Sequence, residues 1–289
     1  MKCRTFIVAA LAASCAGRPV EESQVRGKLV ADGSSSLHPL VLAAAGEFGR
    51  QHPGVEFDIK NGGSGVGIKR LTQGDAQQRI DFAKSSRPIK PAEVELGEKN
   101  GHHVHATVVA AEAIAVVVHP DNSLVNITVD ALKAIYYSGE TVDWSTIPGS
   151  GRRGPIKVVA LDPKVSGTGE MFTELVGGHS KPPFAKIVQI VPDNPDMAAP
   201  ILANVDAIGF CSQAAVAGSK LRILTVNGVR PSEQTVLDTS YRLNRRLYVL
   251  TDGQPRGLMA DFLLFMLSEP GQRLARQRGF TPVTLEVAL

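Results

Sequence analysis

The sequence is poor in cysteine, in aromatic residues and in excess charge of either sign. It has 3 cysteines among 289 residues, and Cys211 is the one that falls inside the predicted folded chain, so a disulfide scaffold is excluded. Aromatic residues make up 5%, which argues against a platform for stacking bases or sugars. The 31 basic and 28 acidic residues nearly cancel, and no basic run is interleaved with aromatics, so nucleic-acid binding is not indicated. What remains is the composition of a globular protein with one large or two modest domains.

The N-terminus has the layout of a secretory signal peptide. Lys2 and Arg4 precede an apolar run at 6–13 (FIVAALAA) that is too short to span a bilayer, and small residues follow it. We therefore expect residues 1–15 to form the signal peptide and the mature protein to be exported, to the periplasm.

Cys15 stands where bacterial lipoproteins carry the cysteine that is acylated before cleavage. The usual motif has Leu or Val three residues before the cysteine, and this sequence has Ala12. We expect a lipid anchor on Cys15, with residues 16–27 as a tether to the membrane. The alternative is ordinary cleavage near Ser14 or Ala16.

Strands and helices alternate along the rest of the chain, which is typical of a parallel or mixed sheet covered by helices. The apolar, β-branched run at 107–118 predicts a buried strand that crosses between domains, and 243–250 predicts the returning strand. Helices are expected at 38–51, 128–137, 256–267 and 271–278, and in shorter segments that end near Leu71 and Val176. A further helix is expected to be capped by Asn194 before Pro195.

Four turns rich in serine and glycine each follow a predicted strand, and three of them precede a predicted helix. They are 33–36 (GSSS), 62–67 (GGSGVG), 85–87 (SSR) and 166–168 (SGT). Unpaired N–H groups and the helix dipole favour an anion at a helix N-terminus, glycine permits close approach, and hydroxyls donate hydrogen bonds. One such turn alone is explained by ordinary capping. Four in succession predict a cage for a small oxyanion.

Several segments occur in the same order as in a known protein family. They include ADGSSSLHPL, NGGSGVGIKRL, DFAKSSRPIK, AEAIAVVVHPDN, YYSGETVDWSTIPG and VSGTGEMF. Over about residues 28–280 the sequence resembles the phosphate-binding proteins of bacterial phosphate ABC transporters. The resemblance implies a class II periplasmic binding protein, with two α/β domains joined by two crossing strands and a ligand cleft between them. Domain one would comprise 28–107 plus 240–289, and domain two 108–239.

The resemblance also implies the function and the ligand contacts. The chain is expected to capture phosphate, without a cofactor and as a monomer, and to deliver it to an ABC-transporter permease. The expected phosphate-binding residues are Ser35, Ser36, Leu37, Ser64, Ser86, Arg87, Ser166, Gly167 and Thr168.

One position departs from the family pattern. Members commonly have an arginine four residues before the Ser-Gly-Thr turn, and this chain has Asp162 there. Two interpretations stay open. In one, Arg87 supplies the positive charge and Asp162 accepts the proton that phosphate, unlike sulfate, still carries at neutral pH. In the other, Asp162 faces solvent and Lys164 supplies some of the charge.

Two other functions are weighed against transport. A phosphatase on the same scaffold is disfavoured, because no His or Cys stands beside a candidate nucleophile. A metal site at His102, His103 and His105 is also disfavoured. His103 and His105 would share one face of an extended segment, but the sequence places no third ligand on that face. A sensory or adhesive protein that binds phosphate without a permease is the other alternative, and the presence or absence of a neighbouring permease operon would decide between them.

Overall fold

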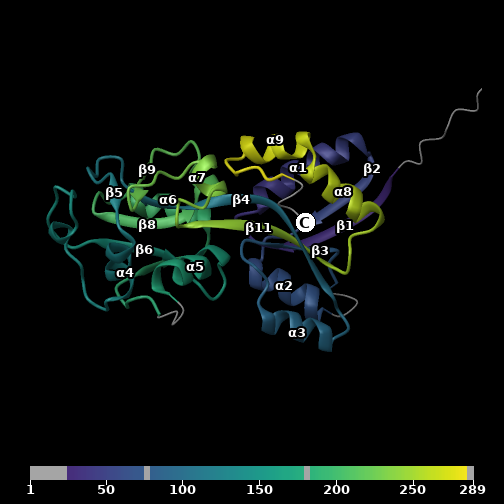
Figure 1. Ribbon diagram of the computed structural model, residues 1–289, viewed down its shortest axis with the longest axis horizontal. Coiled ribbons are helices and arrows are strands. Elements are labelled where there is room, and N and C mark those ends of the chain that lie inside the picture. Colours follow the sequence, from purple (N-terminus) through teal and green to yellow (C-terminus); the bar gives the residue numbers. More distant parts are fainter. Residues whose placement is uncertain (1–24, 75–78, 179–182, 285–289) are drawn as a thin grey trace, which may run out of the picture.

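The computed structural model describes residues 25–74, 79–178 and 183–284. The predicted signal peptide, Cys15 and residues 16–24 of the predicted tether lie outside these ranges. Within them, no helix has both the length and the apolar character needed to cross a bilayer. The described residues form two α/β lobes that lie side by side along the longest axis (Figure 1).

Strands and helices alternate through most of the chain. The strands are β1 (Arg26–Gly33), β2 (Gly54–Ile59), β3 (Phe82–Ser85), β4 (Val104–Val118), β5 (Asn126–Ile127), β6 (Lys157–Leu161), β7 (Gln189–Val191), β8 (Ala207–Ser212), β9 (Arg222–Ile223), β10 (Thr225–Val226) and β11 (Asn244–Asp252). The helices are α1 (His38–Gln51), α2 (Ser64–Gln73), α3 (Pro91–Lys99), α4 (Val129–Tyr137), α5 (Gly167–Phe172), α6 (Ala198–Leu202), α7 (Glu233–Leu237), α8 (Gly257–Leu267) and α9 (Glu269–Gln277).

One sheet runs through both lobes because both share β4 and β11. The strand order is β2-β1-β3-β11-β4-β8-β6-β7, with β9 also paired to β4. β11 pairs antiparallel with β4 from Val104 to Ala113, and the rest of β4 pairs with β8. In Figure 1 these two long strands pass from one lobe to the other. The predicted fold class, two α/β domains joined by two crossing strands, is confirmed, whereas the exact domain boundaries stay a prediction.

The C-terminus returns to the first lobe. Helices α8 and α9 pack beside α1, and Phe262 of α8 contacts Phe48 of α1 with ring centroids 5.5 Å apart. Thr281 then bridges to Ala111 of β4. The first lobe is therefore built from both ends of the described chain.

The crossing strand β4 is buried over its whole second half. Every residue from Val109 to Val118 is buried, and Glu112 is the charged one among them. Cys211 on the neighbouring β8 is also fully buried, and burial raises the pKa of its thiol far above the ordinary value. Cys211 is therefore a small core residue, as the sequence predicts, and no disulfide joins it to another described residue.

Candidate anion-binding site

The four predicted turns follow strands β1, β2, β3 and β6 at their carboxyl ends. Leu37 is the N-cap of α1, and its backbone N–H donates to Ser34 Oγ at 3.3 Å. Ser64 is the first residue of α2. Ser166 caps α5, where its Oγ accepts from the N–H of Gly169 at 3.3 Å. Three turns thus bring the start of a helix toward the region where the lobes meet.

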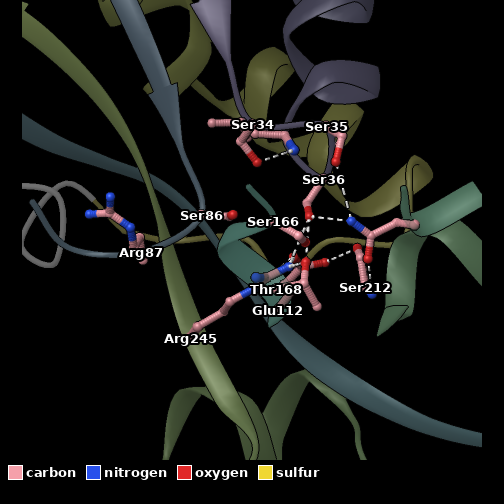
Figure 2. A network of polar contacts seen from close by, with 12 residues as sticks. Ser34, Ser35, Ser36, Ser86, Arg87, Glu112, Ser166, Thr168, Ser212 and Arg245 are labelled. Carbon is pink, nitrogen blue, oxygen red and sulfur yellow. Dashed lines mark hydrogen bonds and ion pairs between the residues drawn. The ribbon is translucent and has the colours of Figure 1, made fainter. Parts of the chain in front are cut away.

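Hydroxyl groups of the two lobes contact each other directly. Ser36 Oγ of the first lobe lies 3.0 Å from Thr168 Oγ1 of the second. Ser64 Oγ lies 3.1 Å from Ser86 Oγ and also accepts from the backbone N–H of Ser86 at 3.1 Å. All four side chains are almost completely buried. We call Ser36, Ser64, Ser86 and Thr168 the hydroxyl cluster. Figure 2 shows Ser36, Ser86 and Thr168 around one small region, with Ser166 beside them.

Gly167 completes the contact between the lobes. A Cβ at this position would lie 2.7 Å from Ser64 Oγ and 2.4 Å from Ser86 Oγ. Ser35 lies at the margin, half-buried, and accepts from Asn194 Nδ2 at 3.3 Å. The structure therefore brings five of the predicted site residues together, with Ser35 beside them.

A buried ion pair that the sequence analysis missed reaches this cluster. Arg245 of β11 donates from Nη2 to Ser36 Oγ at 2.9 Å and to Thr168 Oγ1 at 2.8 Å. Its Nε and Nη2 also lie 3.0 and 2.5 Å from Glu112 Oε1, on β4. Both side chains have no exposed surface. The signal in the sequence was Glu112, the one charge in the apolar stretch 107–118, because a buried charge in such a strand needs a partner. Arg245 gave no such signal, since Arg246 stands beside it in the same strand.

Asn194 and Ser212 extend the network on the side of the second lobe. Asn194 Nδ2 donates to Ser36 Oγ at 3.1 Å, its Oδ1 accepts from Ser212 N at 2.7 Å, and Ser212 Oγ donates to Glu112. The predicted capping role of Asn194 is wrong. Asp193 is the N-cap, accepting from the backbone N–H of Asn194, so the Asn194 side chain is available to bridge the lobes.

Arg87 has carboxylate partners on both sides. Its Nη1 and Nη2 donate to the two oxygens of Glu93 at 2.9 and 2.7 Å, and Nε lies 2.6 Å from Glu170 Oε2 of the second lobe. Burial lowers the pKa of Arg87, but the two carboxylates more than offset this and raise it. In Figure 2 its guanidinium points away from the hydroxyl cluster. The contacts of Arg87 in this structure therefore join the lobes, and its expected contact with phosphate stays a prediction.

Asp162 lies in the loop before α5. Its Oδ1 accepts from the backbone N–H of Lys164 at 2.9 Å, and its backbone carbonyl accepts from Ser166 N at 2.8 Å. The residue also lines a cavity of about 570 Å³ together with Lys164, Glu170 and Phe184. These contacts shape the Ser-Gly-Thr turn from behind, and a role of Asp162 toward phosphate stays a prediction.

A buried lysine lies behind the first turn. Lys84 of β3 has no exposed surface, its carbonyl accepts from Ser34 N at 2.8 Å, and its Nζ lies 2.7 Å from His38 Nδ1. Burial lowers the pKa of Lys84 to about 8, despite the nearby charges of Asp32 and Asp193. Burial and the charge of Lys84 also lower the pKa of His38. The fully buried Lys84 and the half-buried His38 therefore form a polar pair behind the first turn.

The histidines set aside in the sequence analysis do not gather with other ligands. His102 Nδ1 lies 2.8 Å from Asp252 Oδ2. Among the described residues, no three His, Cys, Asp or Glu side chains are grouped so that they could hold a metal ion.

Comparison with known proteins agrees with the resemblance seen in the sequence. A family model described as a PBP superfamily domain matches residues 19–270. "Phosphate-binding protein PstS" of Bacillus subtilis is 29% identical over 91% of this chain and 83% of its own length, and "Protein SphX" of Synechococcus elongatus is 30% identical over 92% and 80%. A putative phosphate ABC transporter substrate-binding protein from Clostridium perfringens, solved with bound phosphate, aligns with a TM-score of 0.77 at 26% identity, covering 89% of this chain and 100% of that one.

Proposed function

The chain belongs to the PBP superfamily, and on that premise we propose that it captures inorganic phosphate outside the cytoplasm and delivers it to an ABC-transporter permease. One observation carries the proposal. Hydroxyl groups from turns far apart in the sequence meet, buried, where the two lobes touch. Hydroxyls and helix-start N–H groups are the donors that a small oxyanion needs when it leaves water. The relatives named for phosphate binding or phosphate transport support phosphate as that oxyanion.

The proposed ligands are the hydroxyls of the hydroxyl cluster, together with Ser166, Gly167 and the N-terminal backbone of α1. Ser36 and Ser64 belong to the first lobe, whereas Gly167 and Thr168 belong to the second. An anion held by both sets would favour the closed arrangement, because each lobe would supply part of its hydrogen bonds. Hinge closure about the two crossing strands is the motion that such a site implies. The closed form would be the one that the permease recognises.

The proposal includes no catalytic step. The one cysteine in the described residues has a buried thiol with a raised pKa, so it is a poor nucleophile. We further propose that Cys15 carries lipid, that the residues before β1 tether a monomer to the membrane, and that no cofactor takes part. The tether is shorter than the expected 16–27, because Arg26 and Gly27 already belong to β1. Mass spectrometry of membrane-extracted protein tests the anchor. A mature chain beginning at Gly17 and recovered free of membranes would contradict it.

Calorimetric titration of residues 16–289 with phosphate, sulfate and molybdate tests the function. We expect one phosphate per chain and much weaker sulfate binding. Ser64→Ala and Thr168→Val should each weaken phosphate binding by at least roughly tenfold, because each removes one buried hydrogen-bonding group. Equal affinity for phosphate and sulfate would reduce the assignment to a general oxyanion receptor. Steady release of phosphate from p-nitrophenyl phosphate, abolished by Ser64→Ala, would instead support a phosphatase.

A further inference from the structure

Arg245 is a buried cation with part of its hydrogen-bonding capacity unused. Its side chain has no exposed surface, and Nη1 has no hydrogen-bond partner among the described residues. Leaving a buried charged group short of partners is costly, so such a group calls for an explanation.

The position of Arg245 suggests the explanation. Its Nη2 lies within hydrogen-bonding distance of Ser36 Oγ in one lobe and of Thr168 Oγ1 in the other. Figure 2 shows the side chain rising from β11 toward Thr168 and the serine turns. The guanidinium is therefore directed at the point where the hydroxyls of the two lobes meet.

Other cations near the lobe contact are already engaged. Arg87 donates to Glu93 and lies against Glu170, and Lys90 Nζ lies 2.5 Å from the second oxygen of Glu170. Lys84 is directed to His38 behind the first turn. None of these contacts of the three cations involves the hydroxyl cluster, whereas two contacts of Arg245 do.

Glu112 makes it possible to bury Arg245. Its Oε1 accepts from Arg245 Nε and Nη2, and its Oε2 accepts from Ser212 Oγ. The carboxylate fixes the guanidinium on one edge and balances its charge while Nη1 stays available. A buried pair of this kind is tolerated because the two charges compensate each other.

We propose that Arg245 is the specificity-determining cation of the oxyanion site, and that Glu112 is a positioning residue that also moderates its charge. The inference rests on the proposed function and adds the charged group that would recognise the anion. Arg245 would donate charge-assisted hydrogen bonds from Nη1 and Nη2, beside the hydroxyls of Ser36 and Thr168. Since Glu112 is negative, it opposes the anion electrostatically even while it orients Arg245. The two residues should therefore have opposite effects on affinity.

The test compares Glu112→Gln with the double variant Arg245→Gln/Glu112→Gln. Replacing Arg245 alone would leave Glu112 buried and unpaired, which endangers folding, so the double variant removes both charges together. Arg242→Gln is the control, because it makes the same Arg-to-Gln replacement at an exposed residue just before β11. Each protein is checked by circular dichroism and titrated calorimetrically with phosphate, sulfate and molybdate.

We expect Glu112→Gln to bind phosphate at least as tightly as the wild type. The double variant should bind at least roughly 100-fold more weakly, because two charge-assisted hydrogen bonds are lost. If the two variants differ by less than about tenfold, Arg245 is a structural residue and the inference is overturned.

The same titrations separate this inference from the proposed function. A wild type that binds sulfate or molybdate but no phosphate overturns the proposed function, and the two variants titrated with that anion then decide the role of Arg245. A wild type that binds none of the three anions overturns both.

Discussion

Gly167 and Ser86 belong to different lobes, and a Cβ on Gly167 would lie 2.4 Å from Ser86 Oγ. Real Cβ atoms are not found at such a distance, so a methyl group here would force the hydroxyls of Ser86 and Ser64, or the lobes themselves, to move apart. Gly167 is not among the glycines with positive φ, so alanine would disturb this contact through its methyl group and not through backbone conformation.

We therefore expect Gly167→Ala to weaken phosphate binding by at least roughly tenfold while leaving the fold intact. Alanine is the better helix former, so the free energy of unfolding should change by less than about 1 kcal/mol. Calorimetry and urea denaturation measure the two effects. Gly46→Ala in α1 is the control, since a Cβ there meets nothing within 4 Å. Unchanged affinity in Gly167→Ala would show that the lobes do not need this contact.

Arg87 and Glu170 provide a second test of how the lobes are held together. In a double-mutant cycle, Arg87→Met and Glu170→Gln should each weaken phosphate binding, with a coupling free energy of about 1–2 kcal/mol, because both break the same contact between lobes. The cycle is measured by titration with phosphate. If Arg87 contacts phosphate itself, as the sequence suggested, Arg87→Met should weaken phosphate binding strongly. The losses of binding free energy from Arg87→Met and Glu170→Gln should then simply add in the double variant.

A substitution of Asp162 distinguishes the two interpretations of why this chain has aspartate where the family commonly has arginine. Its carboxylate accepts from Lys164 N, and asparagine can keep this bond through its side-chain oxygen. We expect Asp162→Asn to leave the affinities for phosphate and sulfate within about twofold of the wild type. A gain in sulfate affinity with a loss in phosphate affinity would instead show that Asp162 accepts the proton of phosphate.

Lys84 should make stability depend on pH in alkaline solution. Its pKa is about 8 in the folded protein, because of burial, and the ordinary value is 10.5. Between these values the unfolded chain binds more protons at this residue than the folded protein does, so the contribution of Lys84 to stability rises with pH.

The measurement is urea denaturation of wild type and Lys84→Met at pH 7.5 and 9.5. From the lower to the higher pH, the wild type should gain roughly 1–2 kcal/mol relative to the variant. Lys69→Met, at an exposed position on α2, is the control. If the free energies of unfolding of wild type and Lys84→Met differ by the same amount at both pH values, Lys84 stays protonated in the folded protein throughout.

Local signals in the sequence were enough to predict most of the elements. Thr128 caps α4 by accepting from Ala131 N, as the sequence predicts, and the apolar run of β4 appears as a long buried strand. Helix α3 was not predicted, because its polar sequence has one buried residue, Gly97, and so lacks a clear apolar face. Strands β9 and β10 were missed because they have two residues each and depend on pairing with distant segments.

The site was predictable where a turn supplies the ligand and not where a strand does. The serine turns carry their own signature, so Ser36, Ser64 and Thr168 were identified from the sequence. Arg245 and Glu112 are 133 residues apart, and only the antiparallel pairing of β11 with β4 brings them together. Asn194 matched a capping pattern, but Asp193 occupies the cap. Choosing between adjacent cap residues requires the three-dimensional path of the chain.

The placement of the C-terminus has a consequence for how the chain folds as it emerges. Helices α8 and α9 cover the first lobe, and the bridge between Thr281 and Ala111 is made by nearly the last described residues. Strand β3 of that lobe pairs with β1 but lacks its second neighbour until β11 arrives. The second lobe is formed mostly from one continuous stretch, so it can complete its core first. The first lobe keeps an open sheet edge and an exposed apolar face until the final helices are made. During this interval the chain is most vulnerable to aggregation and proteolysis.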